Sequence, residues 1–515
     1  MKNITKFLVS VISSLFLLYT LTILDFLSFG TKLIKPTCHN VNIENFNMTV
    51  FTYTTIVSQI LFGAFSGIKS GICGGAIIES QPIAQEIHEY CESNTDNVTD
   101  CISNIYACLV ISTLCFSLIS LLLSYFGAGR IFEYIPKTAL YGVMCSIGMA
   151  LVKCGVLEIY RSEDSLEKNH IHLCMLIAAL LCLLAFYIDE KYPGYIFFIP
   201  CYSILIVVVF YIVVYALGFD MQTLREYELI PTSEDAKVSI KTFTEYISLG
   251  SIRFSIILGC LKNIVGLALF NLIHITVNVP GFVNEMKIQS DINHEFKTQG
   301  IANLATAFTG YPSYFICSSS IFFNKSGGTK KIHAIIGGFA LIPLVFVGPK
   351  SREFLPCILL SFIPIYIGGC FIISNFISLL TQISMLDLAV ILVSTLVGFF
   401  VDPVMGLLAG SSINAFIVLY YYSVGLRTKA ELASVDQDYE VIKIEFLSYF
   451  MTTEILKDRL SINKGNVLID LTNCKYFDLE SNSILENYIS NFEGNIRISG
   501  TPINLYTHKF KDYMM

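Results

Sequence analysis

Charged residues are scarce in this 515-residue sequence. They make up 14% of it, whereas soluble domains carry about 25%. Tryptophan is absent, so an aromatic belt at a membrane interface would have to use the 28 tyrosines. The net charge of −7 does not decide orientation, because local loop charges do. This composition excludes an ordinary soluble domain.

The motifs of several kinds of catalytic and binding site are also missing. The sequence has no Walker motif, no CxxC pair, no His/Cys cluster with metal-site spacing and no nucleophile constellation. The KSGG stretch at 325–328 is too short for a P-loop and is interpreted as a turn. We therefore expect no enzyme, no cofactor, no metal and no nucleic-acid partner.

Long apolar runs dominate what is present. Hydrophobic residues make up 54% of the chain, and the mean hydropathy is +0.65. The apolar start at Phe7–Leu24 lacks a small-residue cleavage site, so we interpret it as a first span rather than a signal peptide. A span needs about 20 apolar residues. We predict a polytopic α-helical membrane protein with spans near 6–30, 50–68, 104–128, 132–155, 170–188, 194–219, 254–279, 331–349, 354–382, 385–402 and 403–424.

Two apolar segments, 71–90 and 310–324, are marked by Gly or Pro and are too short to cross a membrane alone. A moderately polar helix is expected at 296–309. These segments bring the total to roughly fourteen membrane elements, with a short segment third in each half. Paired interrupted segments at matching positions indicate an inverted-repeat transporter with its site at the membrane midplane.

The polar loops predict which side of the membrane each segment faces. Asn47 and Asn97 begin glycosylation sequons in two loops that the count places on the same, non-cytosolic side. Cys38, Cys91 and Cys101 fall there too, and both a Cys91–Cys101 bridge and free thiols are compatible with the sequence. We expect the termini and the following basic residues on the cytosolic side: Lys2, Lys6, Lys325, Lys330, Lys331, Arg427 and Lys429.

The composition changes after residue 425. A polar linker at 426–434 separates the predicted membrane domain, 1–425, from a tail at 435–515 with soluble character. Strand patterns (YEVIKIEFL, NVLIDL, NIRISGT) alternate in the tail with helix patterns (MTTEILKDRL, LESNSILENYISNF). Alternating units of this kind predict a small cytosolic α/β domain.

The stretch 284–328 resembles the SulP/SLC26 anion-transporter superfamily. Its acidic–Asn–Glu cluster, Gly–x–x–Asn helix, Gly–Tyr–Pro turn, Ser-rich half helix and Gly pair follow the family's order. The matching residues are Asp291, Asn293, Glu295, Gly300, Asn303, Gly310, Pro312, Ser318, Ser319, Ser320, Gly327 and Gly328. The tail resembles a truncated STAS domain, with VLIDL followed by Asp478.

A closer resemblance is to a fungal vacuolar-type branch of this family. It rests on LDFLSFG with Asp25, on SQILFGAFSGIKSGICGGAIIES, and on His274 followed by Asn278, Val279 and Pro280. That branch is linked to vacuolar handling of basic amino acids. The superfamily resemblance implies a 7+7 inverted repeat, an elevator-like motion of a core domain against a gate domain, and a homodimer. Substrate is then expected between the facing N-termini of half helices 3 and 10.

These implications select candidate site residues. Gly74 and Gly75 open the first half helix, and Glu79 follows them inside the apolar run. Ionisable groups at membrane depth usually serve a transport path, so Glu79, Asp25 and His274 are candidates for proton coupling. The alternatives are a wet helix end for Glu79, an interfacial carboxylate for Asp25 and a core histidine for His274.

Ser318, Ser319 and Ser320 occupy the second half helix, as substrate ligands or as small residues for helix packing. Many relatives carry a Ser-Arg pair here, and Ser319 stands where the Arg is expected. In the tail, Glu480 stands where phosphorylated relatives carry a Ser, so we predict no phosphorylation switch there.

The sequence therefore predicts a secondary active transporter of sulfate or a similar inorganic anion. The alternatives are a proton-coupled carrier of basic amino acids, a channel, and a non-transporting membrane scaffold or sensor. The expected partners are a small solute with H⁺, the lipid bilayer and a second copy of the chain. A plasma membrane and a vacuole-like membrane are both compatible with the sequence.

Overall fold

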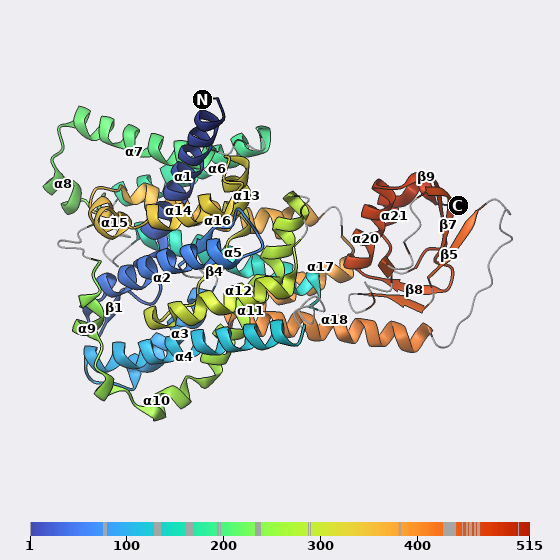
Figure 1. Cartoon of the computed structure of the whole chain (residues 1–515), viewed down its shortest axis with the longest axis horizontal. Helices are drawn as coiled ribbons and strands as arrows, with labels where there is room; N and C mark the ends of the chain where they lie inside the picture. The colour runs from blue at the N-terminus through green and yellow to red at the C-terminus, as the bar shows by residue number, and fades with distance from the viewer. Residues whose placement is uncertain are drawn as a thin grey trace. The chain divides into compact units, whose positions relative to one another are not determined.

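The computed structural model divides into two compact units. Unit 1 comprises Met1–Phe132 and Leu151–Ile367, and unit 2 comprises Glu133–Ala150 and Gly368–Met515 (Figure 1). Each unit is described by itself. The structure describes residues 2–75, 80–127, 135–160, 169–192, 195, 197–231, 238–286, 288, 290–380, 383–425, 439–444, 446–449, 452, 456–457, 460, 464–502 and 504–514.

Unit 1 is built from long apolar helices with short elements between them. Its long helices are α1 (Lys2–Phe29), α2 (Glu44–Phe65), α4 (Val98–Tyr125), α6 (Asn169–Lys191), α7 (Phe198–Leu217), α11 (Leu261–Met286) and most of α16 (Cys357–Asn375). The shorter ones are α3 (Gln81–Ser93), α8 (Met221–Glu226), α9 (Lys241–Tyr246), α10 (Phe254–Gly259), α12 (Ile292–Thr306), α13 (Cys317–Lys325), α14 (Lys331–Ala340) and α15 (Leu344–Arg352).

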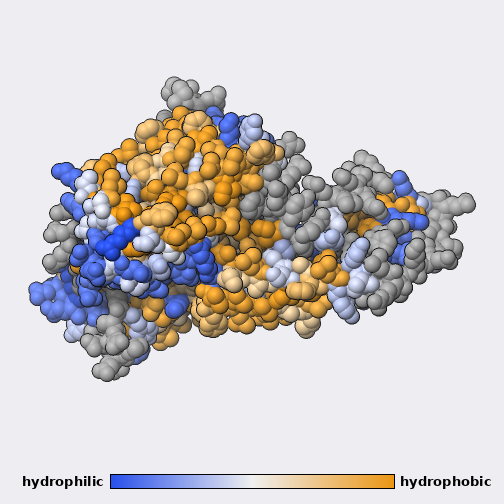
Figure 2. Space-filling model, turned by 90° about the horizontal axis from the view of Figure 1, so that it is seen from below, coloured by the Kyte–Doolittle hydropathy of each residue, from blue (hydrophilic) through white to orange (hydrophobic). Residues whose placement is uncertain are grey.

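The helices confirm the prediction of a multi-spanning membrane protein. Nine helices in the described part of the chain are long and apolar enough to cross a bilayer, or ten if α14 and α15 form one span bent by 58°. The span predicted at 254–279 is wrong at its start: α10 ends at Gly259, and the long helix α11 runs from Leu261 to Met286. Large apolar side chains on α6 and α7, among them Leu183 and Ile212, are exposed, and Figure 2 shows broad areas of hydrophobic surface. Such faces are suited to lipid.

Close packing holds α2, α4, α12 and α14 together. The helix α12 packs along α4, and α2 packs against both α12 and α14. Gly300 permits the first approach, because a Cβ there would lie 3.1 Å from the carbonyl oxygen of Ser117 and closer still to Leu121. The Ser117 hydroxyl donates to the Gly300 carbonyl at 2.7 Å. Small and hydroxyl residues are typical of helix interfaces in membranes.

The start of α1 lies beside the turn that follows α13. Ser10 Oγ donates to the Gly327 carbonyl at 2.5 Å, and Ser13 Oγ donates to the Ser326 carbonyl at 2.6 Å. Gly327 has φ +114°, a backbone conformation that favours glycine. These contacts join two segments whose basic residues are predicted to share the cytosolic side.

Two observations bear on the predicted non-cytosolic loops. Asn47 is 1% exposed in α2, and its amide donates to the carbonyls of Thr31 at 2.7 Å and Ile34 at 3.1 Å. A glycan cannot be attached to a buried nitrogen engaged in this way, so the structure contradicts the Asn47 sequon as a modification site. Asn97 is exposed just before α4, and its glycosylation stays a prediction.

Unit 2 combines membrane helices with the tail. Its helices are α5 (Lys137–Ile159, as far as Ala150), α17 (Met385–Phe400), α18 (Pro403–Gly425), α20 (Leu479–Ser490) and α21 (Thr507–Phe510). Its strands are β5 (Glu440–Lys443), β6 (Phe446–Ser448), β7 (Lys464–Asp470), β8 (Cys474–Phe477) and β9 (Glu493–Ser499). The strands form two parallel sheets, β5-β7-β9 and β6-β8.

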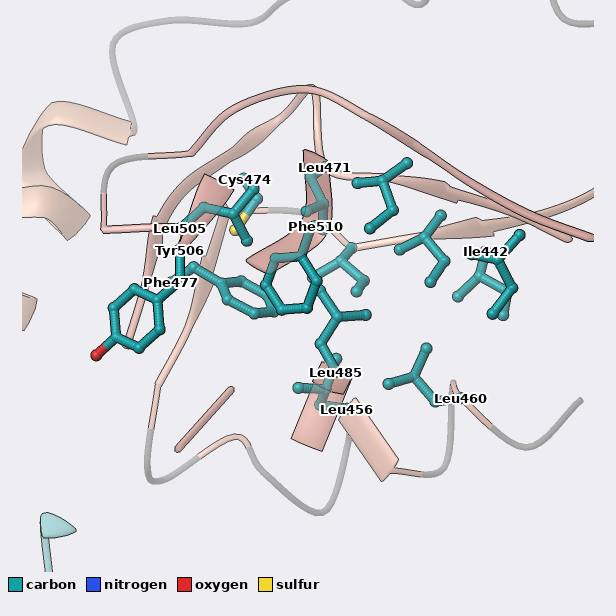
Figure 3. Packing of buried hydrophobic residues seen from close by; sticks show 14 of the residues in the cluster. Ile442, Leu456, Leu460, Leu471, Cys474, Phe477, Leu485, Leu505, Tyr506 and Phe510 are labelled. Carbon is teal, nitrogen blue, oxygen red and sulfur yellow. The ribbon is translucent and has the colours of Figure 1, made fainter. Parts of the chain in front are cut away.

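The tail has its own apolar core. Leu471, Phe477 and Leu485 are among the buried residues there, and Figure 3 shows them converging with Tyr506 and Phe510. The strand predicted from YEVIKIEFL is wrong as one element, since it splits into β5 and β6, which belong to different sheets. Strand β8 was not expected. Most of the helix predicted from MTTEILKDRL lies outside the described residues.

Side chains of the tail bind the N-terminus of α17. Asp387 is 2% exposed, and its Oδ2 accepts hydrogen bonds from Asn504 Nδ2 and from the Tyr506 hydroxyl, both at 2.9 Å. Ser384 caps the same helix by accepting from the Asp387 N–H at 3.1 Å. A buried carboxyl with several hydrogen-bond donors fixes the position of the tail residues against the start of α17.

Glu480 makes the tail sensitive to pH. It is 5% exposed in the first turn of α20, and burial raises the pKa of its carboxyl to about 8, an effect that Lys137 partly offsets. The folded protein therefore binds this proton more tightly than the unfolded chain does. The stability of the folded protein is therefore expected to fall as the pH rises from 4.5, the ordinary pKa of a glutamate carboxyl, to about 8, the pKa of Glu480 in the folded protein.

Replacing Glu480 by glutamine is expected to remove this dependence, because the amide does not ionise. Glu480→Gln should then be more stable than the unmodified protein above the folded-state pKa, with little difference at acidic pH. Thermal unfolding and limited proteolysis of the full-length protein in detergent, below and above that pKa, check this. Glu486→Gln is the matched control, because Glu486 is on the same helix with an exposed ion pair to Lys509. Parallel pH profiles for all three proteins would contradict the assignment.

Candidate functional site

Two very short strands bring the two predicted half-helix segments together. Strand β3 (Cys73–Gly74) pairs antiparallel with β4 (Tyr314–Phe315), with Cys73 opposite Phe315 and Gly74 opposite Tyr314. The Ile316 N–H extends the pairing by donating to the Ile72 carbonyl at 2.9 Å. The strand pair places the start of α13, one residue after β4, beside β3. Ser80, just before α3, lies near the same turn, since its Oγ is 3.1 Å from the Tyr311 hydroxyl.

Gly74 in β3 and Gly75 directly after it are required by close packing. A Cβ on Gly74 would lie 2.8 Å from Tyr314 Cε1, and one on Gly75 would lie 2.9 Å from the Thr55 nitrogen and closer still to the Phe51 carbonyl. The prediction that they begin a helix is wrong, since Gly74 is in a strand and Gly75 follows it in a bend. They instead let the backbone approach β4 and α2.

A buried glutamine on α2 fixes this strand from the other side. Gln59 Oε1 accepts from the Cys73 N–H at 2.8 Å, and its Nε2 donates to the carbonyls of Gly71 at 3.1 Å and Ala334 at 3.2 Å. Gln59 is completely buried. The sequence singled out the Ser-Gln pair only as part of a motif. The structure adds a reason for the glutamine, since a buried amide needs hydrogen-bond partners and here finds them in the backbone.

The three serines of α13 have different environments. Ser320 is fully buried, accepts from the Ile72 N–H at 2.8 Å and donates to the Ile316 carbonyl at 2.6 Å. It therefore joins α13 to the segment before β3. Ser319 is 9% exposed, and Ser318 is exposed. Ser318 and Ser319 are consequently the better-placed members of the set for a ligand.

His274 lies beside the strand pair. It is 2% exposed in α11, between the rings of Phe270 (centroids 5.0 Å apart) and Tyr314 (5.6 Å). Its Nδ1 is 3.4 Å from Asn278 Nδ2, and its Nε2 has no hydrogen-bond partner among the described residues. The structure thus brings His274 to the strand that pairs with Gly74.

Two more polar side chains of unit 1 are completely buried. Asn271, one turn before His274, has no hydrogen-bond partner for either side-chain polar atom within the described ranges. Gln299 on α12 lies beside the Cys73 thiol of β3.

The roles of the two candidate carboxylates both stay predictions. Glu79 lies outside the described residues, so its role stays a prediction. Asp25 is half-buried in α1, which ends at Phe29. Its role in proton coupling also stays a prediction.

Two motif residues have structural roles that the sequence did not reveal. Glu295 on α12 is 0% exposed, and its carboxylate accepts from Ser66 Oγ at 2.7 Å and from the Gly67 N–H at 2.8 Å. It joins α12 to the end of α2. Asn303 fixes the turn before β4: its Oδ1 accepts from the Ser313 N–H at 2.8 Å, and its Nδ2 donates to the Ser313 carbonyl at 3.1 Å.

Interrupted helices that meet inside a bundle of long apolar helices are typical of secondary transporters. The comparison with protein families agrees. The model of the sulfate permease family matches residues 7–394, and the chain belongs to that family. It is a family of membrane transporters of small anions, in agreement with the expectation that the chain is not an enzyme. No curated protein sequence matches the chain significantly.

Several solved structures share the fold. SLC26A9 has a TM-score of 0.59 at 11% identity, over 99% of this chain and 89% of that one. Murine Slc26a9, an anion transporter in an inward-facing state, gives 0.59 at 13% identity with the same coverage. The transmembrane domain of the cyanobacterial bicarbonate transporter BicA gives 0.58 at 14% identity, over 78% of this chain and 97% of that one. At these identities the likeness shows the fold alone.

Proposed function

We propose that this protein is a secondary active transporter of sulfate or a similar inorganic anion. The observation that carries the proposal is the pairing of β3 with β4, which places the start of α13 beside β3, with Ser80 just before α3 near the same turn. Neither helix has a side-chain cap in the described part of the chain. The positive ends of two helix dipoles attract an anion.

The order of the helices supports a 7+7 scheme with alternating access of the elevator type. Counting α1 to α7, then α11, α12, α13, the α14–α15 pair, α16, α17 and α18 gives fourteen elements, with α3 third and α13 tenth. In this scheme the helices around the strand pair form the moving core. The parallel sheets of the tail, with Asp478 capping α20 through the Ser481 N–H at 2.8 Å, support a STAS-type domain. A homodimer and cytosolic termini complete the proposal.

A proton-coupled carrier of basic amino acids is the second candidate. It is favoured by one feature of α13, whose sequence CSSSIFFNK has no cation before Lys325 at its end. An inorganic anion would therefore meet helix ends without a fixed positive side chain from this helix. A zwitterionic or cationic solute could place its own carboxylate there, with Glu79 or His274 handling a proton.

Uptake into proteoliposomes separates the two candidates. Radiolabelled sulfate and radiolabelled arginine are offered to the purified protein with and without an inward pH gradient, with protein-free vesicles as the control. Sulfate uptake supports the first candidate, and gradient-driven arginine uptake supports the second. Uptake of neither solute under any gradient would contradict the carrier and favour a membrane scaffold.

The same vesicles test proton coupling. Glu79→Gln is expected to abolish the response of uptake to the pH gradient, because the amide cannot carry a proton, while gradient-independent exchange continues. His274→Gln is compared with it as the second candidate group. If pH-driven uptake in Glu79→Gln equals that of the unmodified protein, Glu79 does not carry the proton.

A further inference from the structure

Thiol, imidazole and carboxylate groups from three separate segments converge away from the strand pair. They come from the strand β1 (Thr37–Cys38), the turn after it, the second half of α3 and the start of α4. Two groups of possible ligands share Cys38: Cys38, His39 and Cys101 form one, and Cys38, His88 and Glu92 form the other. In each group the ligand atoms lie within 4.8 Å of one another.

The two thiols and one imidazole of this cluster are sealed from solvent. Cys38, His88 and Cys101 are each 0% exposed. The His88 ring faces the Glu92 carboxylate, with 3.6 Å between Nε2 and Oε2, and the backbone of Thr37. Buried polar groups need partners, and coordination of a cation would give this imidazole a stronger one.

The backbone also positions this cluster. His39 and Asn40 have φ +46° and +65° and form the two-residue turn between β1 and β2 (Val41–Asn42), as the type I′ hairpin requires. Glu92 holds the turn by accepting from the His39 N–H at 2.8 Å, and Thr95 Oγ1 lies 3.3 Å from His39 Nε2. The Glu92 side chain thus faces His88 and also holds the backbone of His39.

We propose that this cluster is a structural zinc site. Cys38, His39 and Cys101 supply three ligands, whose atoms lie within 4.8 Å of one another, and His88, which lies that close to Cys38, supplies the fourth, with Glu92 as the outer partner that orients it. Zinc in closed structural sites takes four thiolate or imidazole ligands. Thiolates select soft or borderline cations over Mg²⁺ and Ca²⁺. Binding displaces the thiol protons of Cys38 and Cys101 into solvent.

The ion would tie β1 and α4 to α3, the helix that follows β3. His88 lies about 10 Å along α3 from its start at Gln81, at 1.5 Å per residue. The site is therefore separate from the candidate substrate site, while it fixes the helix that contributes to it. The expectation of no metal came from spacing along the chain, where Cys38, His88 and Cys101 show no motif.

Metal analysis of the full-length protein in detergent tests the proposal. The protein is incubated with Zn²⁺, desalted and analysed by mass spectrometry for zinc. Cys38→Ser and Cys101→Ser are expected to lose one zinc per chain, and Glu92→Gln to lower the affinity by roughly tenfold. Cys201→Ser, which removes an exposed thiol on α7, should retain the zinc of the unmodified protein. Equal zinc content in all four variants would overturn the proposal.

Two measurements on the unmodified protein keep the test independent of whether the variants fold. Co²⁺ should give a thiolate-to-metal charge-transfer band that Zn²⁺ abolishes. The proposal is overturned if no such band forms, or if peptide mapping without reductant finds Cys38 and Cys101 joined in a disulfide, the other pairing that an oxidising compartment permits.

Discussion

Replacing Gly75 by alanine is expected to abolish uptake of whichever solute the protein carries. The new Cβ would lie 2.9 Å from the Thr55 nitrogen and even closer to Thr55 Oγ1 and the Phe51 carbonyl oxygen. The nearest atoms include backbone of α2, which cannot rotate away as a flexible side chain can. Either β3 or α2 has to shift, and a shift of β3 breaks its pairing with β4. Misplacement of a site by about 1 Å can reduce a rate by about 100-fold.

Uptake by Gly75→Ala and the unmodified protein in proteoliposomes, at equal protein incorporation, measures this effect. Gly250→Ala is the matched control, since a Cβ there meets only Ser248 Oγ, at 3.9 Å. Size-exclusion profiles and thermal unfolding separate a displaced strand from general misfolding. Full activity of Gly75→Ala would show that the strand pair does not have to stay in this geometry.

The membrane helices could be predicted because each carries its own signal. A run of about 20 apolar residues identifies a span without any knowledge of its neighbours, and the structure has helices where such runs lie. Boundaries were less certain where the apolar pattern continued through a break. The helix breaks at Cys260, between α10 and α11, inside a stretch that is mostly apolar. The sequence therefore placed the start of that span seven residues too early.

The strand pair could not be predicted in the same way. Strands of two residues have no periodicity, and β3 and β4 are paired across more than two hundred residues of chain. Gly74 and Gly75 were selected from the sequence as a helix start, whereas in the structure they allow close approach to β4 and α2. His274 was selected as a titratable residue in a span, and its contact with Tyr314 is a tertiary fact that the sequence does not contain.

The contacts among the cysteines also could not be predicted from the sequence. Cys91 and Cys101 were considered together because both are near one polar loop. In the structure both are free thiols. Cys101 lies beside Cys38, and Cys91 lies beside Cys108 and Cys260. Separation along the chain gave no indication of either group, because the fold of α3 against α4 decides which thiols meet.

Glu295 offers the second large expected effect, in this case on stability. Its carboxylate is the acceptor for two donors, the Ser66 hydroxyl and the Gly67 N–H, at the point where α2 ends. Glu295→Ala would leave the buried Ser66 hydroxyl without this acceptor, whereas the N–H of the exposed Gly67 can bind water instead. A lost hydrogen bond to a charged group costs about 1.5–3 kcal/mol, so a destabilisation of about 2–3 kcal/mol is expected.

Thermal unfolding of the full-length protein in detergent measures this loss, with Glu190→Ala, an exposed glutamate on α6, as the control. Glu295→Gln should be milder, since its amide oxygen can still accept from Gly67. A double-mutant cycle with Ser66→Ala isolates the Ser66–Glu295 hydrogen bond. If that hydrogen bond contributes, the double variant is destabilised less than the two single variants combined. Additive effects would mean that Glu295 supports α2 through Gly67 alone, and an unchanged melting temperature for Glu295→Ala would contradict the joint between α2 and α12.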